Sequence, residues 1–212
     1  MKKFELITDT KMVFGRKLFR IKALISFGNV EEGELGGYVE KEENLSHYGN
    51  AWVYGNARVS GDAMVYGNAE VYGNAEVYGN AEVSDNARVH GNARVSGDAL
   101  VSGDARVYGD ARVYGNAEVF GDAEVSDNAR VFGDARVYEL THILTVSYIG
   151  SRFKTTTFMR SKDNNIIVAC GCFTGTIEEF ANAVKETREG TIYEQQYNLA
   201  IEMAKLSIRD ED

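Results

Sequence analysis

The chain has 212 residues, a formal net charge of −9, 44% hydrophobic residues, two cysteines and no proline. This hydrophobic content is ordinary for a globular protein and too high for intrinsic disorder, and two cysteines exclude a disulfide framework. No stretch approaches about 18 consecutive apolar residues, and the start lacks the apolar core of a signal peptide, so we expect a soluble, cytoplasmic protein without membrane association. The acidic balance argues against wholesale coating of nucleic acid.

Residues 1–48 are expected to form a small β-structured cap. Residues 4–8 and 13–24 alternate apolar and polar side chains well enough to be strands, with Gly15 near a turn. Residues 31–43 are acidic and contain glycine, which is typical of a loop that leads into the next region.

A six-residue unit, Val-x-Gly-(Asn/Asp)-Ala-x, repeats over residues 49–138. Valine recurs every six residues from Val53 to Val137, fifteen times, and alanine does the same from Ala51 to Ala135. Such a short period fits a short strand followed by a sharp corner, so three units predict one triangular turn of a parallel β-helix. Alternation along each strand points Val and Ala inward. Gly followed by Asn or Asp suits the corner, and proline would remove a ladder hydrogen bond.

The two ends of the repeat are less regular than its middle. The valine phase continues at Ile143 and again six positions later, so the solenoid is predicted over residues 49–149, with five or six coils. Upstream, the step from Leu45 to Val53 is longer by two positions than the regular step. Either a two-residue insertion interrupts a coil at this point, or the solenoid starts near Ala51.

Residues 150–212 are expected to form a separate α/β domain. Two strands, 153–159 and 166–173, flank a short polar segment and predict a β-hairpin. The sequence Thr-Ile-Glu-Glu at 176–179 has the form of a capping box, which indicates the start of a helix. A second helix is predicted over residues 192–208, because its apolar residues share one face.

Outward-facing residues at the same place in successive coils are predicted to stack in columns along the solenoid. One column places Arg94, Arg112 and Arg130 about 4.8 Å apart. Guanidinium groups this close repel each other unless an anion or a carboxylate lies between them, so they favour a site for an anionic ligand. The alternative is that they pair with corner carboxylates such as Asp98 and Asp110. With the neighbouring aromatic residues, the candidate ligand-binding residues are Arg94, Arg112, Arg130, Tyr78, Tyr114 and His90.

The repeat resembles the hexapeptide repeat of left-handed β-helix proteins, in which an aliphatic residue is followed four positions later by a small one, as Val53 is by Ala57. The resemblance covers residues 49–138 and implies a left-handed coil and a homotrimer whose helices lie side by side. Proteins of this GNAxVx type with short end domains resemble products of bacteria and their phages that are commonly labelled acyltransferases or polymer-forming proteins. We therefore expect a mainly β fold: a left-handed parallel β-helix of about five to six coils, a small N-terminal β cap, and a C-terminal α/β domain with a β-hairpin and two helices.

Catalytic chemistry finds little support in the residues. Acyltransferases of the resembled family use a histidine as base and interrupt the coils with a loop that helps to build the active site. The chain has only His47, His90 and His142, and no loop interrupts the repeat. A carbonic anhydrase of this fold needs three histidines at a metal. Cys170 and Cys172 are interpreted as core or half-buried thiols, and we expect no catalytic residue, no metal and no cofactor.

The expected function is that of a non-catalytic binding protein on a trimeric scaffold, with the phage or mobile-element association that the resemblance implies. One interpretation is that it sequesters a small anionic, nucleotide-like ligand in grooves between subunits, since arginine and aromatic side chains suit phosphates and bases. Another is that it binds a host protein through residues 150–212. The enzymatic alternative is an acyl-CoA-dependent hexapeptide acyltransferase.

Overall fold

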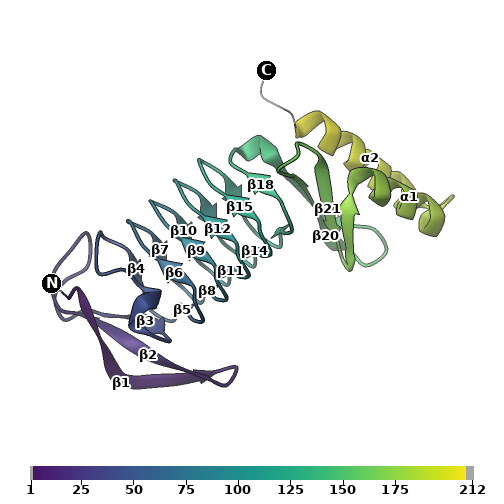
Figure 1. Ribbon diagram of the computed structural model, residues 1–212. Coiled ribbons are helices and arrows are strands. Elements are labelled where there is room, and N and C mark those ends of the chain that lie inside the picture. The colour runs from purple at the N-terminus through teal and green to yellow at the C-terminus, as the bar shows by residue number, and fades with distance from the viewer. Residues whose placement is uncertain (1, 209–212) are drawn as a thin grey trace.

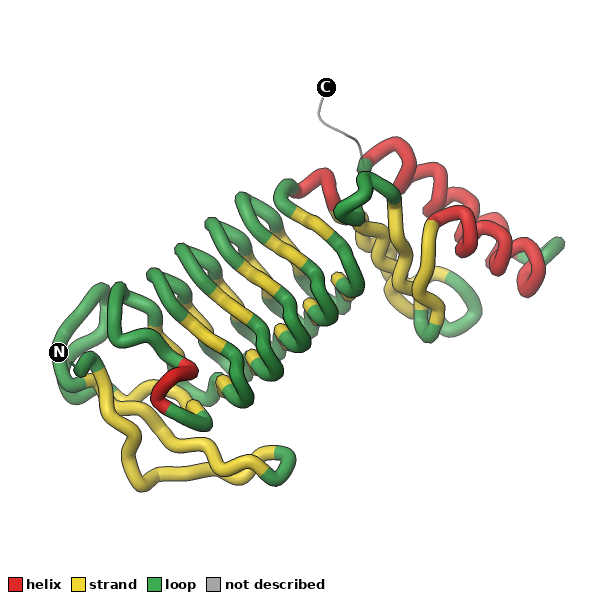
Figure 2. Tube along the Cα trace, in the orientation of Figure 1, coloured by secondary structure: helices red, strands yellow, loops and turns green. Residues whose placement is uncertain are grey.

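A parallel β-solenoid forms the centre of the computed structural model, which describes residues 2–208 (Figures 1 and 2). A region of strands lies at the N-terminal end of the solenoid, and an antiparallel sheet with two helices lies at the other end. The described coils contain fifteen two-residue strands. These are β4 (Trp52–Val53), β5 (Arg58–Val59), β6 (Met64–Val65), β7 (Glu70–Val71), β8 (Glu76–Val77), β9 (Glu82–Val83), β10 (Arg88–Val89), β11 (Arg94–Val95), β12 (Leu100–Val101), β13 (Arg106–Val107), β14 (Arg112–Val113), β15 (Glu118–Val119), β16 (Glu124–Val125), β17 (Arg130–Val131) and β18 (Arg136–Val137).

The coils stack into three parallel sheets, one on each side of the solenoid. Paired residues among β4–β18 are separated by three repeat units, as in the pairing of Arg94 with Arg112 and of Val95 with Val113. The coil length predicted from the repeat is therefore confirmed. We call the side formed by β5, β8, β11, β14 and β17 the arginine face. The other two sides consist of β4, β7, β10, β13 and β16, and of β6, β9, β12, β15 and β18.

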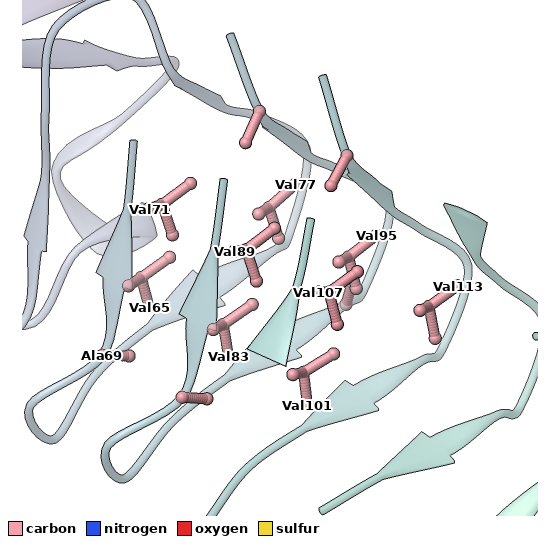
Figure 3. Packing of buried hydrophobic residues seen from close by; sticks show 14 of the residues in the cluster. Val65, Ala69, Val71, Val77, Val83, Val89, Val95, Val101, Val107 and Val113 are labelled. Carbon is pink, nitrogen blue, oxygen red and sulfur yellow. The ribbon is translucent and has the colours of Figure 1, made fainter. Parts of the chain in front are cut away.

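The repeated valine and alanine residues fill the interior of the solenoid. Every valine of the repeat from Val53 to Val137 is fully buried, and every repeat alanine from Ala51 to Ala135 is at most 1% exposed. Figure 3 shows valines of successive coils pointing into the same interior space. Because burial of one such side chain stabilises the fold by about 1.5–3 kcal/mol, the repeat itself supplies the core of this part of the chain.

Glycine at the corners lets successive coils approach each other closely. Gly97 has a φ of 71°, and a Cβ at this position would lie 2.9 Å from the backbone nitrogen of Gly115 in the next coil. Asp85 and Asp127 take the same corner position with positive φ, which aspartate adopts more readily than most residues. Corner amides also donate to the matching residue of the next coil, in the pairs Asn50–Asn68, Asn68–Asn86, Asn74–Asn92, Asn80–Asp98, Asn86–Asp104, Asn92–Asp110 and Asn116–Asp134.

The irregular spacing before the repeat reflects a two-residue insertion in a coil. β3 (Leu35–Val39) pairs in parallel with β5, which places Val39 opposite Val59, and Leu45 bridges Val65. In each of these two pairs, the partners lie two positions further apart in the sequence than the regular coil length. The short helix η1 (Glu42–Asn44) lies between Val39 and Leu45. The insertion is therefore confirmed over a start near Ala51. The loop expected over residues 31–43 is wrong where β3 forms, because this strand carries buried side chains into the first coil.

β1 (Phe4–Val13) and β2 (Arg16–Ala23) form an antiparallel hairpin that joins the sheet of the arginine face through β3. Just before β1, Lys3 is only 1% exposed, and its Nζ donates to the carbonyl oxygen of Ala51 at 2.8 Å. Burial of the charged ammonium lowers the pKa of Lys3 to about 8. The N-terminal strands are thus anchored to the first coil by a buried, titratable side chain.

The C-terminal region is an antiparallel sheet covered by two helices, which confirms the predicted hairpin and helix pair. Thr176 Oγ1 accepts from the backbone of Glu179, and the Glu179 carboxylate accepts from the backbone of Thr176, so the capping box is also confirmed. No helix in residues 2–208 is long and apolar enough to cross a membrane. The elements are β19 (Ile143–Ile149), β20 (Lys154–Arg160), β21 (Ile166–Cys170), β22 (Phe173–Thr176), α1 (Ile177–Arg188) and α2 (Ile192–Ser207).

The expectation that the coils continue through residues 143–149 is wrong. The short helix η2 (Leu140–His142) follows β18, and β19 then pairs antiparallel with β20 instead of with a coil strand. An antiparallel partner from a nearby hairpin satisfies the same backbone groups as a parallel coil would. The six-residue spacing of Ile143 and Ile149 therefore does not mark another coil.

Two glycine substitutions distinguish the effect of close contact between coils from the effect of backbone strain at positive φ. Gly97→Ala and Gly133→Ala both place alanine at positive φ, which costs about 1–2 kcal/mol. Only Gly97 faces another coil, since a Cβ at Gly133 meets nothing within 4 Å. We expect Gly97→Ala to lower the free energy of unfolding by roughly 1–3 kcal/mol more than Gly133→Ala, measured by chemical denaturation. Equal effects would contradict the proposed role of the corners.

The buried lysine predicts a dependence of stability on pH. An unfolded lysine keeps the ordinary pKa of 10.5, whereas folded Lys3 titrates at about 8, so the unfolded chain binds more protons between these values. The free energy of unfolding contributed by Lys3 therefore rises as the pH rises through this window. Chemical denaturation of the wild type and of Lys3→Met at a series of pH values measures this effect. We expect the free energy of unfolding to rise less steeply with pH in Lys3→Met than in the wild type. Parallel pH profiles of the two proteins would refute a buried, charged Lys3.

A cationic cleft as the candidate functional site

Charged residues on the outside of the solenoid pair across neighbouring coils. In each pair, arginine and glutamate lie at the same position of successive coils. Stacking of the coils therefore brings the opposite charges within about 4 Å of each other, and the regular backbone of the coils is kept. The pairs are Arg58–Glu76, Glu70–Arg88, Glu76–Arg94, Arg106–Glu124 and Glu118–Arg136.

The arginine face departs from this pattern at Arg112. Its partners in the two adjacent coils are Arg94 and Arg130, so three guanidinium groups follow each other in register. Arg94 is compensated by Glu76, whose Oε2 lies 3.3 Å from Arg94 Nε. Within the described residues, Arg112 makes no ion pair and no side-chain hydrogen bond, and none of the three arginines pairs with a corner aspartate. The alternative that corner carboxylates neutralise this column is therefore wrong.

Arg130 connects the arginine face to the C-terminal domain. Its Nη1 donates to the carbonyl oxygen of Gly171 at 2.6 Å, and its Nη2 donates to Tyr114 Oη at 2.7 Å. Its backbone nitrogen donates to Thr157 Oγ1 on β20 at 3.1 Å. Because these partners are neutral, they fix the guanidinium in place without cancelling its charge.

A cavity of about 900 Å³ opens where the C-terminal domain lies against the arginine face. We call it the cationic cleft. Its charged lining consists of five cationic and two acidic side chains, in a chain of net charge −9. Within residues 2–208, Arg152 and Lys154 resemble Arg112 in making no ion pair and no side-chain hydrogen bond. The charged residues are Arg94, Arg112, Arg130, Arg152, Lys154, Asp110 and Asp127.

Two aromatic side chains at this cleft sit on strained backbone. Tyr148 and Phe153 have φ values of 60° and 48°, and their side chains are 81% and 64% exposed. Both line the cationic cleft and lie close to the turn between β19 and β20. Large residues rarely adopt this conformation, and such strain is concentrated at functional sites. The turn thus presents two exposed rings beside the unpaired cations.

The sequence-predicted residues separate into three places. Arg94, Arg112 and Arg130 line the cationic cleft, and Tyr114 adjoins it through its hydrogen bond to Arg130. Tyr78 lies instead in a cavity of about 420 Å³ beneath the β1–β2 hairpin, which Arg94 also lines.

His90 lies on another side of the solenoid, on the sheet that contains β10. Its ring stacks between Tyr72 and Tyr108, with centroid distances of 4.5 and 5.1 Å. Burial lowers the pKa of His90, and the positive charges of Arg88 and Arg106 lower it further. These effects favour the neutral form of His90, and the structure does not bring this residue to Arg94, Arg112 or Arg130.

The other two histidines lie at the ends of the solenoid. His47 Nε2 is 2.6 Å from Glu42 Oε1, and His142 is fully buried with Nε2 2.9 Å from Arg160 Nη1. None of the three histidines lines the cationic cleft as the described residues form it, and no group of three or more metal-ligating side chains occurs among them. What this cleft offers chemically is positive charge, hydrogen-bond donors and aromatic rings.

Sequence reasoning missed the half of the cleft that the C-terminal domain contributes. Arg152 and Phe153 lie in the turn before β20, and Lys154 is the first residue of β20, so in the sequence they look like an ordinary exposed hairpin. Their significance comes from the position of this turn over the arginine face, and no local pattern encodes that position.

Comparison with known families finds matches in the solenoid alone. Five segments match the YdcK beta solenoid repeat, at residues 51–67, 57–73, 93–109, 105–121 and 123–139. Together they cover about a third of the chain, and each is nearly one coil long. A search of curated proteins returned no match. The chain therefore carries a β-helix repeat that is similar to the YdcK beta solenoid repeat.

Proposed function

We propose that this protein is a non-catalytic binding protein that holds a small, phosphate-bearing ligand in the cationic cleft. The observation that carries the proposal is the convergence of three unpaired cations, Arg112, Arg152 and Lys154, on one cavity of an acidic protein, as the described part of the chain forms it. Within one chain, the cavity already gathers cations from the coils and from the C-terminal domain.

Charge accounts for the choice of ligand. Like charges in a cavity raise the energy of the folded protein, and an anion between them removes that repulsion. Arginine presents a planar fork of donors that matches phosphate oxygens, and lysine adds a point charge. Asp110 and Asp127 at the cleft disfavour a ligand that fills the whole cavity with negative charge. A phosphate group joined to a less charged part fits this lining.

The exposed rings favour a nucleotide-like ligand over a simple inorganic anion. Tyr148 and Phe153 offer stacking surfaces close to the cations. Nucleobases stack on exposed aromatic side chains whatever the identity of the base. Their strained backbone also argues that these rings are displayed for contact rather than for packing.

For the scaffold we propose a left-handed, hexapeptide-type solenoid that assembles as a homotrimer in the cytoplasm. The spacing of an aliphatic residue four positions before a small one supports the left-handed family, as does the uninterrupted six-residue period. Exposed aromatic and aliphatic side chains on the coils, such as Tyr78 and Met64, support an interface between copies. The free thiols Cys170 and Cys172 support a reducing compartment.

A second candidate function is binding of a protein through the C-terminal domain. α2 exposes Ile192, Leu199 and Met203 at spacings of seven and four positions, so they share one helix face. Their side chains are 59%, 70% and 52% exposed. An apolar stripe of this kind is a recurrent docking surface for proteins.

The anion-binding proposal is tested with inorganic tripolyphosphate and isothermal titration calorimetry. We expect saturable binding by the wild type that weakens as salt is added, because exposed charges are screened. Arg112→Gln is expected to weaken binding about tenfold to a hundredfold, the equivalent of roughly 1.5–3 kcal/mol for a charged hydrogen bond.

Arg106→Gln is the matched control for this experiment. Arg106 occupies the same position of the repeat, but it lies on another side of the solenoid and pairs with Glu124. We expect Arg106→Gln to bind tripolyphosphate as the wild type does. The proposal fails if the wild type shows no saturable binding, or if both variants lose affinity equally.

A further inference from the structure

A further cavity, of about 310 Å³, lies within the C-terminal domain between its sheet and its helices. Phe173, Phe180 and Tyr197 supply aromatic rings to its wall, and Ala183 and Val184 of α1 supply aliphatic groups. We call this cavity the aromatic pocket. Its size lies at the lower end of the range for small-molecule pockets, which suits one ring system rather than a whole cofactor.

The aromatic pocket adjoins the cationic cleft. Both cavities are lined by Arg152, Lys154, Gly171 and Cys172. Arg152 lies in the turn between β19 and β20, Lys154 begins β20, and Gly171 and Cys172 form the turn between β21 and β22. Gly171 has a φ of 59°, and a Cβ at this position would meet no atom within 4 Å. The space beside Gly171, between the two cavities, is therefore open. A ligand that passes these four residues contacts the cations on one side and the aromatic rings on the other.

The rings of the aromatic pocket are arranged to receive another ring. Phe180 lies 5.1 Å from Phe173 at an interplanar angle of 49°, and 5.4 Å from Tyr197 at 83°. All three rings line the cavity, so a further aromatic ring bound there can make tilted or edge-to-face contacts of the same kind. Burial raises the pKa of Tyr197 to about 12, so its hydroxyl stays protonated and remains a hydrogen-bond donor.

The polar groups of the pocket favour a heteroaromatic ring over a plain hydrocarbon. Arg188 and Ser151 line it together with the Tyr197 hydroxyl. Cys170 Sγ donates weakly to Tyr197 Oη at 3.8 Å, a contact that does not use the hydroxyl proton, so a ligand acceptor can take that proton. Ring nitrogens and exocyclic groups of a base are acceptors and donors of the required kind, whereas an alkyl chain leaves these groups without partners.

We propose that the aromatic pocket binds the base of a nucleoside polyphosphate whose phosphates lie in the cationic cleft. This inference rests on the proposed function and adds to it the chemical class of the ligand. It places the base against Phe173, Phe180 and Tyr197 instead of against the exposed rings of Tyr148 and Phe153. The phosphate contacts stay with Arg112, Arg152 and Lys154.

The test compares ATP with tripolyphosphate, which carries a similar phosphate chain without base or sugar. Titration calorimetry on the wild-type protein requires no variant for the first comparison. We expect ATP to bind about tenfold more tightly, or better, because the base adds stacking that tripolyphosphate lacks. Equal affinity for the two ligands would overturn the aromatic pocket and leave the anion site standing. Absence of binding by both would overturn the anion site as well.

Ala183→Leu fills the aromatic pocket from α1, and Asn182→Leu adds the same side chain at the adjacent, exposed position of α1 outside the pocket. Leucine is a strong helix former, only slightly weaker than alanine and stronger than asparagine, so neither substitution is expected to disturb α1. We expect Ala183→Leu to lose the advantage of ATP while it binds tripolyphosphate as the wild type does, and Asn182→Leu to keep both affinities. A full ATP advantage in Ala183→Leu, or tighter binding of an alkyl phosphate than of ATP by the wild type, would overturn the proposal.

Discussion

The rest of the structure depends on the constant length of the coils over residues 51–137. In this part of the chain, Val and Ala fill the interior because each coil has the same length and phase as the next, and the backbone ladder sets the spacing between coils. Corner glycines such as Gly97 make this spacing possible by removing the Cβ that would meet the neighbouring coil. The register that aligns the buried valines also aligns the surface residues, so each outward-facing side chain lies beside the side chain at the same position of the next coil.

The charge pattern follows from that register. Where glutamate and arginine alternate along a column, as Glu70 and Arg88 do, stacking turns them into partners. Where arginine follows arginine, the same stacking concentrates positive charge, and Arg112 lies in the middle of such a run. The C-terminal domain then covers this place with two further cations and two exposed rings. A regular scaffold and one local departure from its pairing rule are thus enough to build a cleft with a defined ligand preference.

The sequence predicts what is periodic and fails on what depends on tertiary placement. The inward valines, the corners and the register of the three stacked arginines all follow from a six-residue count. β19 departs from the prediction because Ile143 keeps the spacing of the repeat while its backbone finds an antiparallel partner in β20. The repeat does not predict the role of Arg152 and Lys154, because that role depends on which surface their hairpin covers in the folded protein. His90 follows the repeat but lies on another side of the solenoid.

Two deletions test most directly whether coil register creates the cleft. Removing residues 55–72 takes out one coil and leaves Glu76 beside Arg94, whereas removing residues 115–120 takes out a third of a coil. Both variants keep every cation of the cleft. The first deletion preserves every column, so tripolyphosphate affinity should stay close to that of the full chain. The second turns Arg94 and Arg112 away from the C-terminal domain, so affinity should fall about tenfold or more. Equal affinity in the two deletion variants would contradict the account.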